Sequence, residues 1–204
     1  GERRDGPLAI DTESGGLAPF RHKLRTIQVG DTRQGWVIPW ERWGGFALEI
    51  MKSWEGDWVA HHGCFDWRFI KKHTGFEIPW HKLGDTMTMA GLDHPLRAKG
   101  LKPLSGTLID RRALAGERAL KDGMHANKWD WATVPVDFPP YWNYGALDPV
   151  LTAHLDQILR PRVEADCPEA YALERSANRN CARMMMHGFS LDVPYVEKAI
   201  KDFR

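Results

Sequence analysis

The apolar residues 7–10 are followed directly by two carboxylates in the sequence Asp11-Thr12-Glu13. Side chains of a β-strand alternate between its two faces, so Asp11 and Glu13 point the same way. Two carboxylates at this spacing repel each other unless a cation lies between them. Hard divalent cations such as Mg²⁺ and Mn²⁺ are the usual partners of such oxygen ligands. The pair therefore predicts a strand that ends at a metal site, provided that further carboxylates reach the same place.

The composition limits the chain to one main folded unit. Its 204 residues, 43% of them hydrophobic, suffice for one sizeable core and a small appendage. The formal net charge of +1 identifies no polyanionic partner, and no apolar run approaches the roughly 20 residues of a membrane span. The cysteines are far apart, which is typical of reduced thiols in a cytoplasmic protein. Because the chain starts at Gly1 and stops at Arg204 inside a helical pattern, we expect a piece of a longer protein.

Hydrophobic periodicity predicts an α/β fold with a mixed sheet. Strands are predicted at residues 8–12, 26–29, 36–38 and 58–61, and helices at 47–54, 66–72, 85–89, 101–108 and 147–158. Asp85 is expected to cap the third helix, and Pro161 to end the last. A meander of strands followed by alternating strands and helices is typical of a mixed sheet. The Trp- and Pro-rich residues 110–143 show no period, so we expect an irregular insert with a covering or functional role.

Three further side chains follow the predicted strand and helix ends. Asp66 comes after the strand 58–61, at the start of a helix. Tyr144 and Asp148 are four residues apart at the start of the long helix, so they lie on one face. Each alone has a simpler explanation: Asp66 as a helix cap, Asp148 as a first-turn acid, and Tyr144 as a core aromatic. Together with Asp11 and Glu13, they predict a site of four carboxylates with a phenol beside it.

These segments together resemble the three exonuclease motifs of the DEDD superfamily, in the form that carries a tyrosine (DEDDy). Asp-x-Glu on a first strand, aromatic-Asp after a later strand and Tyr-x-x-x-Asp on a helix occur in that order over about residues 6–160. The DEDDy branch includes RNase D and the 3′–5′ proofreading domains of family A DNA polymerases. The resemblance implies an RNase H-like mixed β-sheet flanked by helices, with a short C-terminal helical appendage.

Finer matches resemble the polymerase branch. Leu17 lies where proofreading domains carry an apolar residue against the terminal base, and Asp85 with its successor resembles the start of the helix after the second motif. Residues 184–192 are similar to the segment that leads into the polymerase module. The resemblance implies an exonuclease domain at residues 1–160 and, at 161–204, the start of a polymerase module. It also implies a phage-like protein that acts in the bacterial or infected host cytoplasm.

The resemblance also implies a mechanism with two divalent metal ions, Mg²⁺ or Mn²⁺. Asp11 bridges both ions, Glu13 and Asp148 complete the first, and Asp66 holds the second through water. Tyr144 orients the attacking water, because a phenol with a pKa of about 10 is a poor base at neutral pH. The expected product is a nucleoside monophosphate.

The expected substrate is a frayed single-stranded DNA 3′ end, with Leu17, Thr12, His62 and Phe65 as contact residues. The family usually has Asn at the position of His62, and a neutral imidazole still donates one hydrogen bond. Phe65 or Trp129 could stack on bases, and Leu17 is equally consistent with plain packing. Residues 97–128 contain eight basic and three acidic side chains, a net charge of +5. This stretch favours a track for the phosphate backbone over an ordinary solvated face.

Two other functions compete with proofreading. The first is an RNA-trimming exonuclease of the RNase D type, against which the polymerase-like residues 184–192 argue. The second is a non-catalytic scaffold that binds DNA. We rank it last because all four carboxylates and the tyrosine are present.

Overall fold

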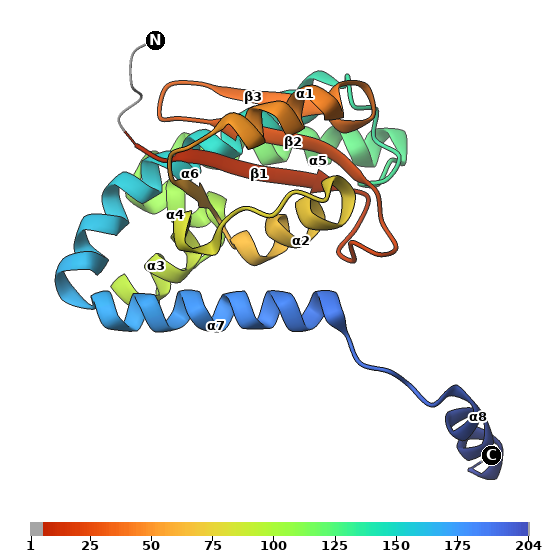
Figure 1. Ribbon diagram of the computed structural model, residues 1–204. Helices are drawn as coiled ribbons and strands as arrows, with labels where there is room; N and C mark the ends of the chain where they lie inside the picture. Colours follow the sequence, from red (N-terminus) through yellow and green to blue (C-terminus); the bar gives the residue numbers. More distant parts are fainter. Residues whose placement is uncertain (1–5, 204) are drawn as a thin grey trace.

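The computed structural model describes residues 6–203, which form a mixed sheet flanked by helices (Figure 1). The sheet has five strands in the order β3-β2-β1-β4-β5. The central strand β1 (Leu8–Ser14) pairs antiparallel with β2 (Leu24–Gly30), which pairs antiparallel with the edge strand β3 (Gly35–Pro39). On its other side, β1 runs parallel to β4 (Trp58–Ala60), and β4 runs parallel to β5 (Leu83–Asp85). This arrangement confirms the predicted mixed sheet.

Helices cover both faces of the sheet. In chain order they are α1 (Trp40–Ser53), α2 (Gly63–Thr74), α3 (Thr86–Asp93), α4 (Leu101–Leu108), α5 (Ala115–Asn127), α6 (Pro139–Asp166), α7 (Pro168–His187) and α8 (Val193–Asp202), with 3-10 turns η1 (Trp80–Lys82) and η2 (Arg111–Leu114). α1 and α2 pack on one face, where Met51 and Phe69 join the main apolar core. α6 crosses the other face and contacts β1, β2, β3 and β4.

The alternation of side chains along β1 gives its two faces different compositions. Ile10 is buried in the apolar core beneath α1 and α2. Ala9 points the other way and clusters with Ala153 of α6. Asp11 and Glu13 follow Ala9 at steps of two residues, so they lie on the α6 face. The strand therefore carries its large apolar residues to one side and its carboxylates to the other.

The Trp- and Pro-rich residues 110–143 are more regular than predicted. They contain η2, α5 and the first turn of α6. Leu120 and Met124 of α5 are one turn apart and pack against Val134 and Tyr141. The prediction of an irregular insert was wrong because these two large apolar residues are too few to produce a recognisable helical period.

α6 is longer than predicted at both ends. Its first turn contains prolines at residues 139–140, where the missing N–H groups have no partner inside the helix in any case. The helix continues past Pro161, which was expected to end it, to Asp166. Leu159 and Val163, on either side of Pro161, are buried in a second apolar cluster. This packing maintains the helix although Pro161 removes one of its hydrogen bonds.

The two C-terminal helices differ in their contacts. α7 packs against α2 and α3, and it buries Tyr171 and Ala182. The Tyr171 hydroxyl accepts a hydrogen bond of 3.1 Å from the main-chain N–H of Asp85, whose side chain caps α3 as predicted. α8 lies apart from the sheet in Figure 1, and Phe203 at its end is 91% exposed. No helix within residues 6–203 is long and apolar enough to cross a membrane.

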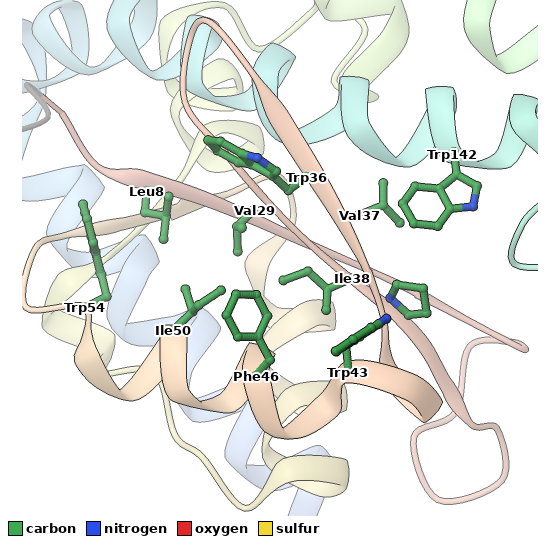
Figure 2. A pocket seen from close by; sticks show the side chains of 11 residues that line it. Leu8, Val29, Trp36, Val37, Ile38, Trp43, Phe46, Ile50, Trp54 and Trp142 are labelled. Carbon is green, nitrogen blue, oxygen red and sulfur yellow. The ribbon is translucent and has the colours of Figure 1, made fainter.

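An apolar groove of about 670 Å³ lies between the edge strand β3 and α1 (Figure 2). Its aromatic lining consists of Trp36, Trp43, Phe46, Trp54 and Trp142. None of the described residues that line it is charged. The groove is therefore chemically distinct from the carboxylates on the α6 face of β1.

Candidate active site

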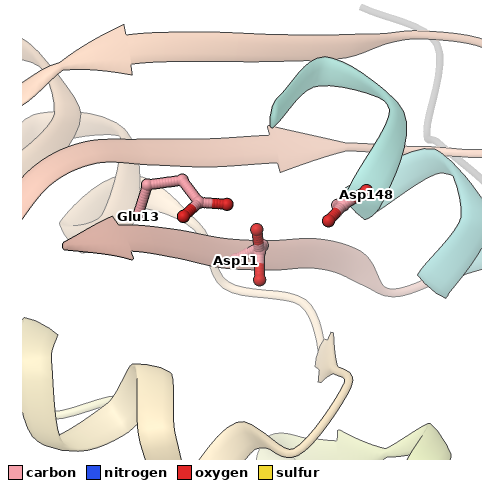
Figure 3. Close-up of side chains that lie close together, drawn as sticks. All are labelled: Asp11, Glu13 and Asp148. Atoms are coloured by element: carbon pink, nitrogen blue, oxygen red, sulfur yellow. The ribbon is translucent and has the colours of Figure 1, made fainter. Parts of the chain in front are cut away.

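Three carboxylates from two elements come together at the α6 face of β1. Asp11 and Glu13 lie on β1, and Asp148 lies on α6 (Figure 3). One ligand oxygen from each residue lies within 4.8 Å of the other two. Oxygens this close can share one hard divalent cation. Among the described residues, this is the only such group of three or more metal-ligand side chains.

Glycines allow α6 to come close enough to the sheet for Asp148 to reach β1. A Cβ atom on Gly145 would lie 3.1 Å from Gln28 Nε2 of β2, which is tighter than ordinary packing. A Cβ atom on Gly35 of β3 would overlap a main-chain carbonyl oxygen of α6. At each of these two contacts a glycine lets the helix and the sheet approach closely, and this packing places Asp148 beside the carboxylates of β1.

Asp66 lies beside this group, buried on the first turn of α2. Its Oδ1 accepts a hydrogen bond of 2.7 Å from the hydroxyl of Thr12, the residue between Asp11 and Glu13. Asp66 is outside the group of three whose ligand atoms lie within 4.8 Å. Thr12 is a predicted substrate contact, but its buried side chain is directed to Asp66. Its hydroxyl is therefore already engaged with Asp66.

Burial and mutual repulsion disfavour the charged forms of these carboxylates. Burial raises the pKa of Asp11 from its ordinary 3.8 to about 6, although the charge of Lys102 acts in the opposite direction. Burial, and then the charges of Asp11 and Asp66, hold the pKa of Glu13 well above its usual range. Within residues 6–203, Asp11 Oδ2 is buried without a hydrogen-bond partner. A divalent cation would supply that partner and relieve the repulsion, so these residues fit a metal site.

Lys102, on the first turn of α4, places a positive charge at this site. Its side chain is 5% exposed, its ammonium contacts Asp148 Oδ1, and its Nζ lies 4.5 Å from the ring centroid of Tyr144. Burial lowers the pKa of Lys102 to about 8, and the charges of Asp11 and Glu13 oppose this change. A count of charges cannot show that a lysine is buried. From the sequence, Lys102 is therefore only one member of the basic stretch 97–128.

Several of the eight basic side chains in that stretch are paired or buried, among them Arg97, Lys102 and Arg112. Arg97 pairs with Asp93 at 2.7 Å, and Arg112 pairs with Asp110 at 2.6 Å. Lys102 is buried at the carboxylates. Pairing with nearby acids and burial therefore divide the stretch, which composition alone could not show.

A second concentration of positive charge lies at the end of β1. A hollow of about 420 Å³ is lined by Gly15, Arg21, His22, Lys23, Arg25, Glu41 and Arg42, among others. Arg25 donates hydrogen bonds to the carbonyls of Trp131 (2.9 Å) and Val134 (2.6 Å), which ties β2 to the segment before α6. Because Gly15 is two residues after Glu13, the hollow adjoins the carboxylate end of β1. Most of its basic side chains belong to the short basic run at residues 21–25, which was the available signal in the sequence.

Tyr144, also on α6, packs against Trp131, with ring centroids 5.9 Å apart. Burial, and then the charges of Glu13 and Asp11, raise the pKa of its phenol. The phenol therefore stays protonated at neutral pH. It can donate a hydrogen bond but cannot act as a base.

The remaining predicted substrate residues are less tightly grouped. Leu17, in the connection after β1, is 81% exposed and available to a ligand. Phe65 packs against Phe69, with ring centroids 4.8 Å apart, and Trp129 packs against Phe138 at 5.3 Å. Both candidate stacking residues thus already have an aromatic neighbour.

His62 lines a separate hollow of about 360 Å³ together with Asp85 and Lys99. It stands immediately before α2 with φ of +65°, in the left-handed region. Asn, Asp and His are the non-glycine residues most often found there. The backbone at this position therefore favours both His, which this chain has, and Asn, which the family usually has there.

A family model described as 3′–5′ exonuclease matches residues 2–164. A search of curated proteins finds no match.

The fold is similar to those of several solved nucleases. A structure described as the apo form of a nuclease has a TM-score of 0.69 at 20% identity, covering 93% of this chain and 89% of that one. Brucella melitensis NrnC with bound Mg²⁺ has a TM-score of 0.68 at 21% identity, with 92% and 89% covered, and NrnC has also been solved bound to pGG. Escherichia coli RNase D, described as an exoribonuclease involved in structured RNA processing, has a TM-score of 0.60 at 18% identity, with 92% and 46% covered. These similarities confirm the predicted RNase H-like fold.

Proposed function

The chain belongs to the 3′–5′ exonuclease family of the DEDD type, and on this basis we propose that it removes nucleotides from single-stranded 3′ ends. The observation that carries the proposal is the approach of Asp11, Glu13 and Asp148 to within 4.8 Å, with Asp66 beside them. Such a group binds hard cations, and phosphodiester hydrolysis needs cations to neutralise the reacting phosphate. The product is a nucleoside monophosphate.

The three grouped carboxylates would hold the metal, and the buried, unpartnered Oδ2 of Asp11 supports this assignment. Bound divalent ions lower the pKa of water and stabilise the attacking and leaving oxygens. We propose that the site would hold two ions and that Asp11 would be a ligand of both. Asp11 is close to Glu13 and Asp148 on one side, and its charge acts on Asp66 on the other.

The other residues orient the substrate and the water. The protonated Tyr144 phenol donates a hydrogen bond that orients the attacking water. Thr12 holds Asp66 through its hydroxyl. Leu17 supplies an exposed apolar contact for the terminal base. The basic hollow at Gly15 attracts the phosphate backbone without reading the base sequence.

We propose RNA as the preferred substrate. The support is the similarity to NrnC, solved bound to pGG, and to RNase D, described as an exoribonuclease. This reverses the order given by the sequence, where DNA came first. Neither the carboxylates nor the apolar contact at Leu17 depends on the sugar, so motif residues alone do not choose between the two.

Proofreading for a DNA polymerase in the same chain, as in a phage replication enzyme, is the second candidate. Residues 188–192 separate α7 from α8, α8 exposes Tyr195 and Ile200, and Phe203 directly after it is also exposed. A helix with such exposed apolar side chains favours packing against a further module, which supports this candidate.

A direct assay separates these candidates. RNA and DNA oligonucleotides of one sequence, labelled at the 5′ end, are incubated with Mg²⁺ or Mn²⁺ or with chelator. We expect stepwise shortening from the 3′ end only with metal, and faster shortening of RNA. Asp11→Asn should lower the rate by about 10³-fold or more, because it removes the shared ligand.

The matched control is Asp137→Asn, the same chemical change at an exposed position outside the site. It should leave the rate unchanged. Faster shortening of DNA would favour the second candidate. Wild-type protein that binds metal but shortens neither strand would contradict the exonuclease proposal.

A further inference from the structure

Lys102 is the only buried lysine among residues 6–203, and it is buried at the carboxylates. It lies on the first turn of α4, which packs against α6. Its ammonium contacts Asp148 Oδ1 and lies 4.5 Å from the ring centroid of Tyr144. Lysine is almost never buried unless it is paired. Asp148 and Tyr144 therefore specify where this charge lies.

The same Asp148 is one of the three carboxylates whose ligand oxygens lie within 4.8 Å. A divalent ion held there and the Lys102 ammonium are thus two cations with one carboxylate in common. Buried charges are screened little by water, so the two cations repel each other strongly. The Tyr144 ring gives the ammonium a second favourable contact, because the face of an aromatic ring attracts a cation.

We propose that Lys102 is an internal counter-cation that competes with the divalent metal for Asp148 and thereby sets the metal affinity of the site. This inference rests on the metal site of the proposed function. Metal binding exchanges the ion pair between Lys102 and Asp148 for a carboxylate–metal bond. The ammonium keeps its contact with Tyr144. Lys102 is a positioning residue, since it acts through Asp148 and Tyr144.

Two consequences follow for the site. The ammonium of Lys102 holds Asp148 in place, although the negative charges of Asp11 and Glu13 repel it. It also weakens metal binding, because the arriving ion must displace one positive charge and remain near it. Removal of the charge should therefore tighten metal binding while it destabilises the metal-free protein.

Calorimetric titration with Mn²⁺ at pH 7, where Lys102 with its pKa of about 8 is charged, tests this prediction in wild type and Lys102→Met, a substitution that keeps the length of the side chain. We expect the Kd for Mn²⁺ to fall about tenfold in the variant, a conservative figure for a unit charge at close range. In chelator, the Tm of the variant should be lower than that of wild type, because Asp148 loses its partner. Saturating Mn²⁺ should raise the Tm of the variant by more than that of wild type.

Lys52→Met is the matched control, because Lys52 is exposed on α1 and its loss changes the net charge equally. It should leave the Kd unchanged. Lys102→Gln, which keeps a hydrogen-bond donor for Asp148, gives the same readout if circular dichroism shows the Met variant to be unfolded. An unchanged or larger Kd in the folded Lys102 variant would overturn the proposal. If the Lys102 variant binds Mn²⁺ more tightly but the wild-type protein has no nuclease activity, only the proposed function is overturned.

Discussion

On one face of β1, Ile10 is buried among apolar side chains, whereas on the other face Asp11 and Glu13 lie half-buried beside the buried Asp148. Burial of an isoleucine stabilises a fold by about 1.5–3 kcal/mol. Burial of like charges has the opposite sign, as the raised pKa values of Asp11 and Glu13 show. Adjacent residues of one strand therefore contribute oppositely to the free energy of folding. The apolar face stabilises the fold. On the carboxylate face, the close approach of the side chains becomes favourable only when a cation is bound.

Asp11→Asn should stabilise the metal-free protein at pH 7.5, although it removes activity. The pKa of Asp11 in the folded protein is about 6, above its ordinary 3.8. Protonation therefore stabilises the fold fully below pH 3.8, and this contribution is lost as the pH rises through 6. The difference corresponds to at most about 3 kcal/mol. In chelator, the variant should have a Tm roughly 5–10 °C above wild type at pH 7.5, and the two should converge near pH 4.

The control for this experiment is Ile10→Val, one residue away on the opposite face. It should cost about 0.5–1.5 kcal/mol at both pH values and leave the rate of the folded enzyme unchanged. Thermal scans of wild type and the two variants at pH 4 and 7.5 measure both changes in stability. An Asp11→Asn variant no more stable than wild type at pH 7.5 would contradict the assigned cost of burying the Asp11 charge.

Tyr144→Phe tests whether the carboxylate face also needs a hydrogen-bond donor. The rate should fall by about 10²-fold, the scale of losing one positioning group. Mn²⁺ affinity and Tm should persist, because the ring remains for Lys102 and Trp131 to contact. Single-turnover rates at saturating Mn²⁺ measure the effect. Tyr195→Phe, the same change at a side chain 69% exposed on α8, is the control.

A rate within twofold of wild type would remove Tyr144 from the mechanism. The raised pKa of Tyr144 adds a second check. Its phenol stays protonated through the alkaline range of an ordinary tyrosine. The wild-type rate should therefore show no loss from tyrosine ionisation below about pH 10.

The sequence predicted those parts of the site that depend on local spacing. A step of two residues on a strand relates Asp11 to Glu13, and a step of four on a helix relates Tyr144 to Asp148. Such rules need no knowledge of how distant segments pack. The mixed sheet was predictable for the same reason, because strands and helices alternate with recognisable periods. β4 and β5 have three residues each, but β4 is wholly apolar and was predicted, whereas β5 has Leu83 as its one large apolar residue and was missed.

The parts that sequence reasoning missed depend on contacts between distant segments. Lys102 reads as one member of a basic stretch, and only the packing of α4 on α6 brings it to Asp148. Gly35 and Gly145 become informative only once α6 is known to lie against the sheet. The basic hollow likewise combines the start of α1 with the connection between β1 and β2. Tertiary packing therefore determined the electrostatics of the site, while local pattern determined its ligands.

Thr12 lies between Asp11 and Glu13 on β1 but contacts Asp66 on α2, and the smallest expected effect concerns this contact. Its hydroxyl is buried and donates to Asp66 of α2 at 2.7 Å, so it orients a carboxylate that is outside the grouped three. Thr12→Val keeps the shape and removes this donor. The kcat should fall about tenfold with KM unchanged, the scale of one hydrogen bond to a charged group. Thr12→Ser, which keeps the hydroxyl, should restore most of the rate. If the Thr12 side chain instead contacted the substrate, KM would rise in the Val variant. A rise in KM with constant kcat would therefore reassign Thr12 from positioning Asp66 to binding the nucleic acid.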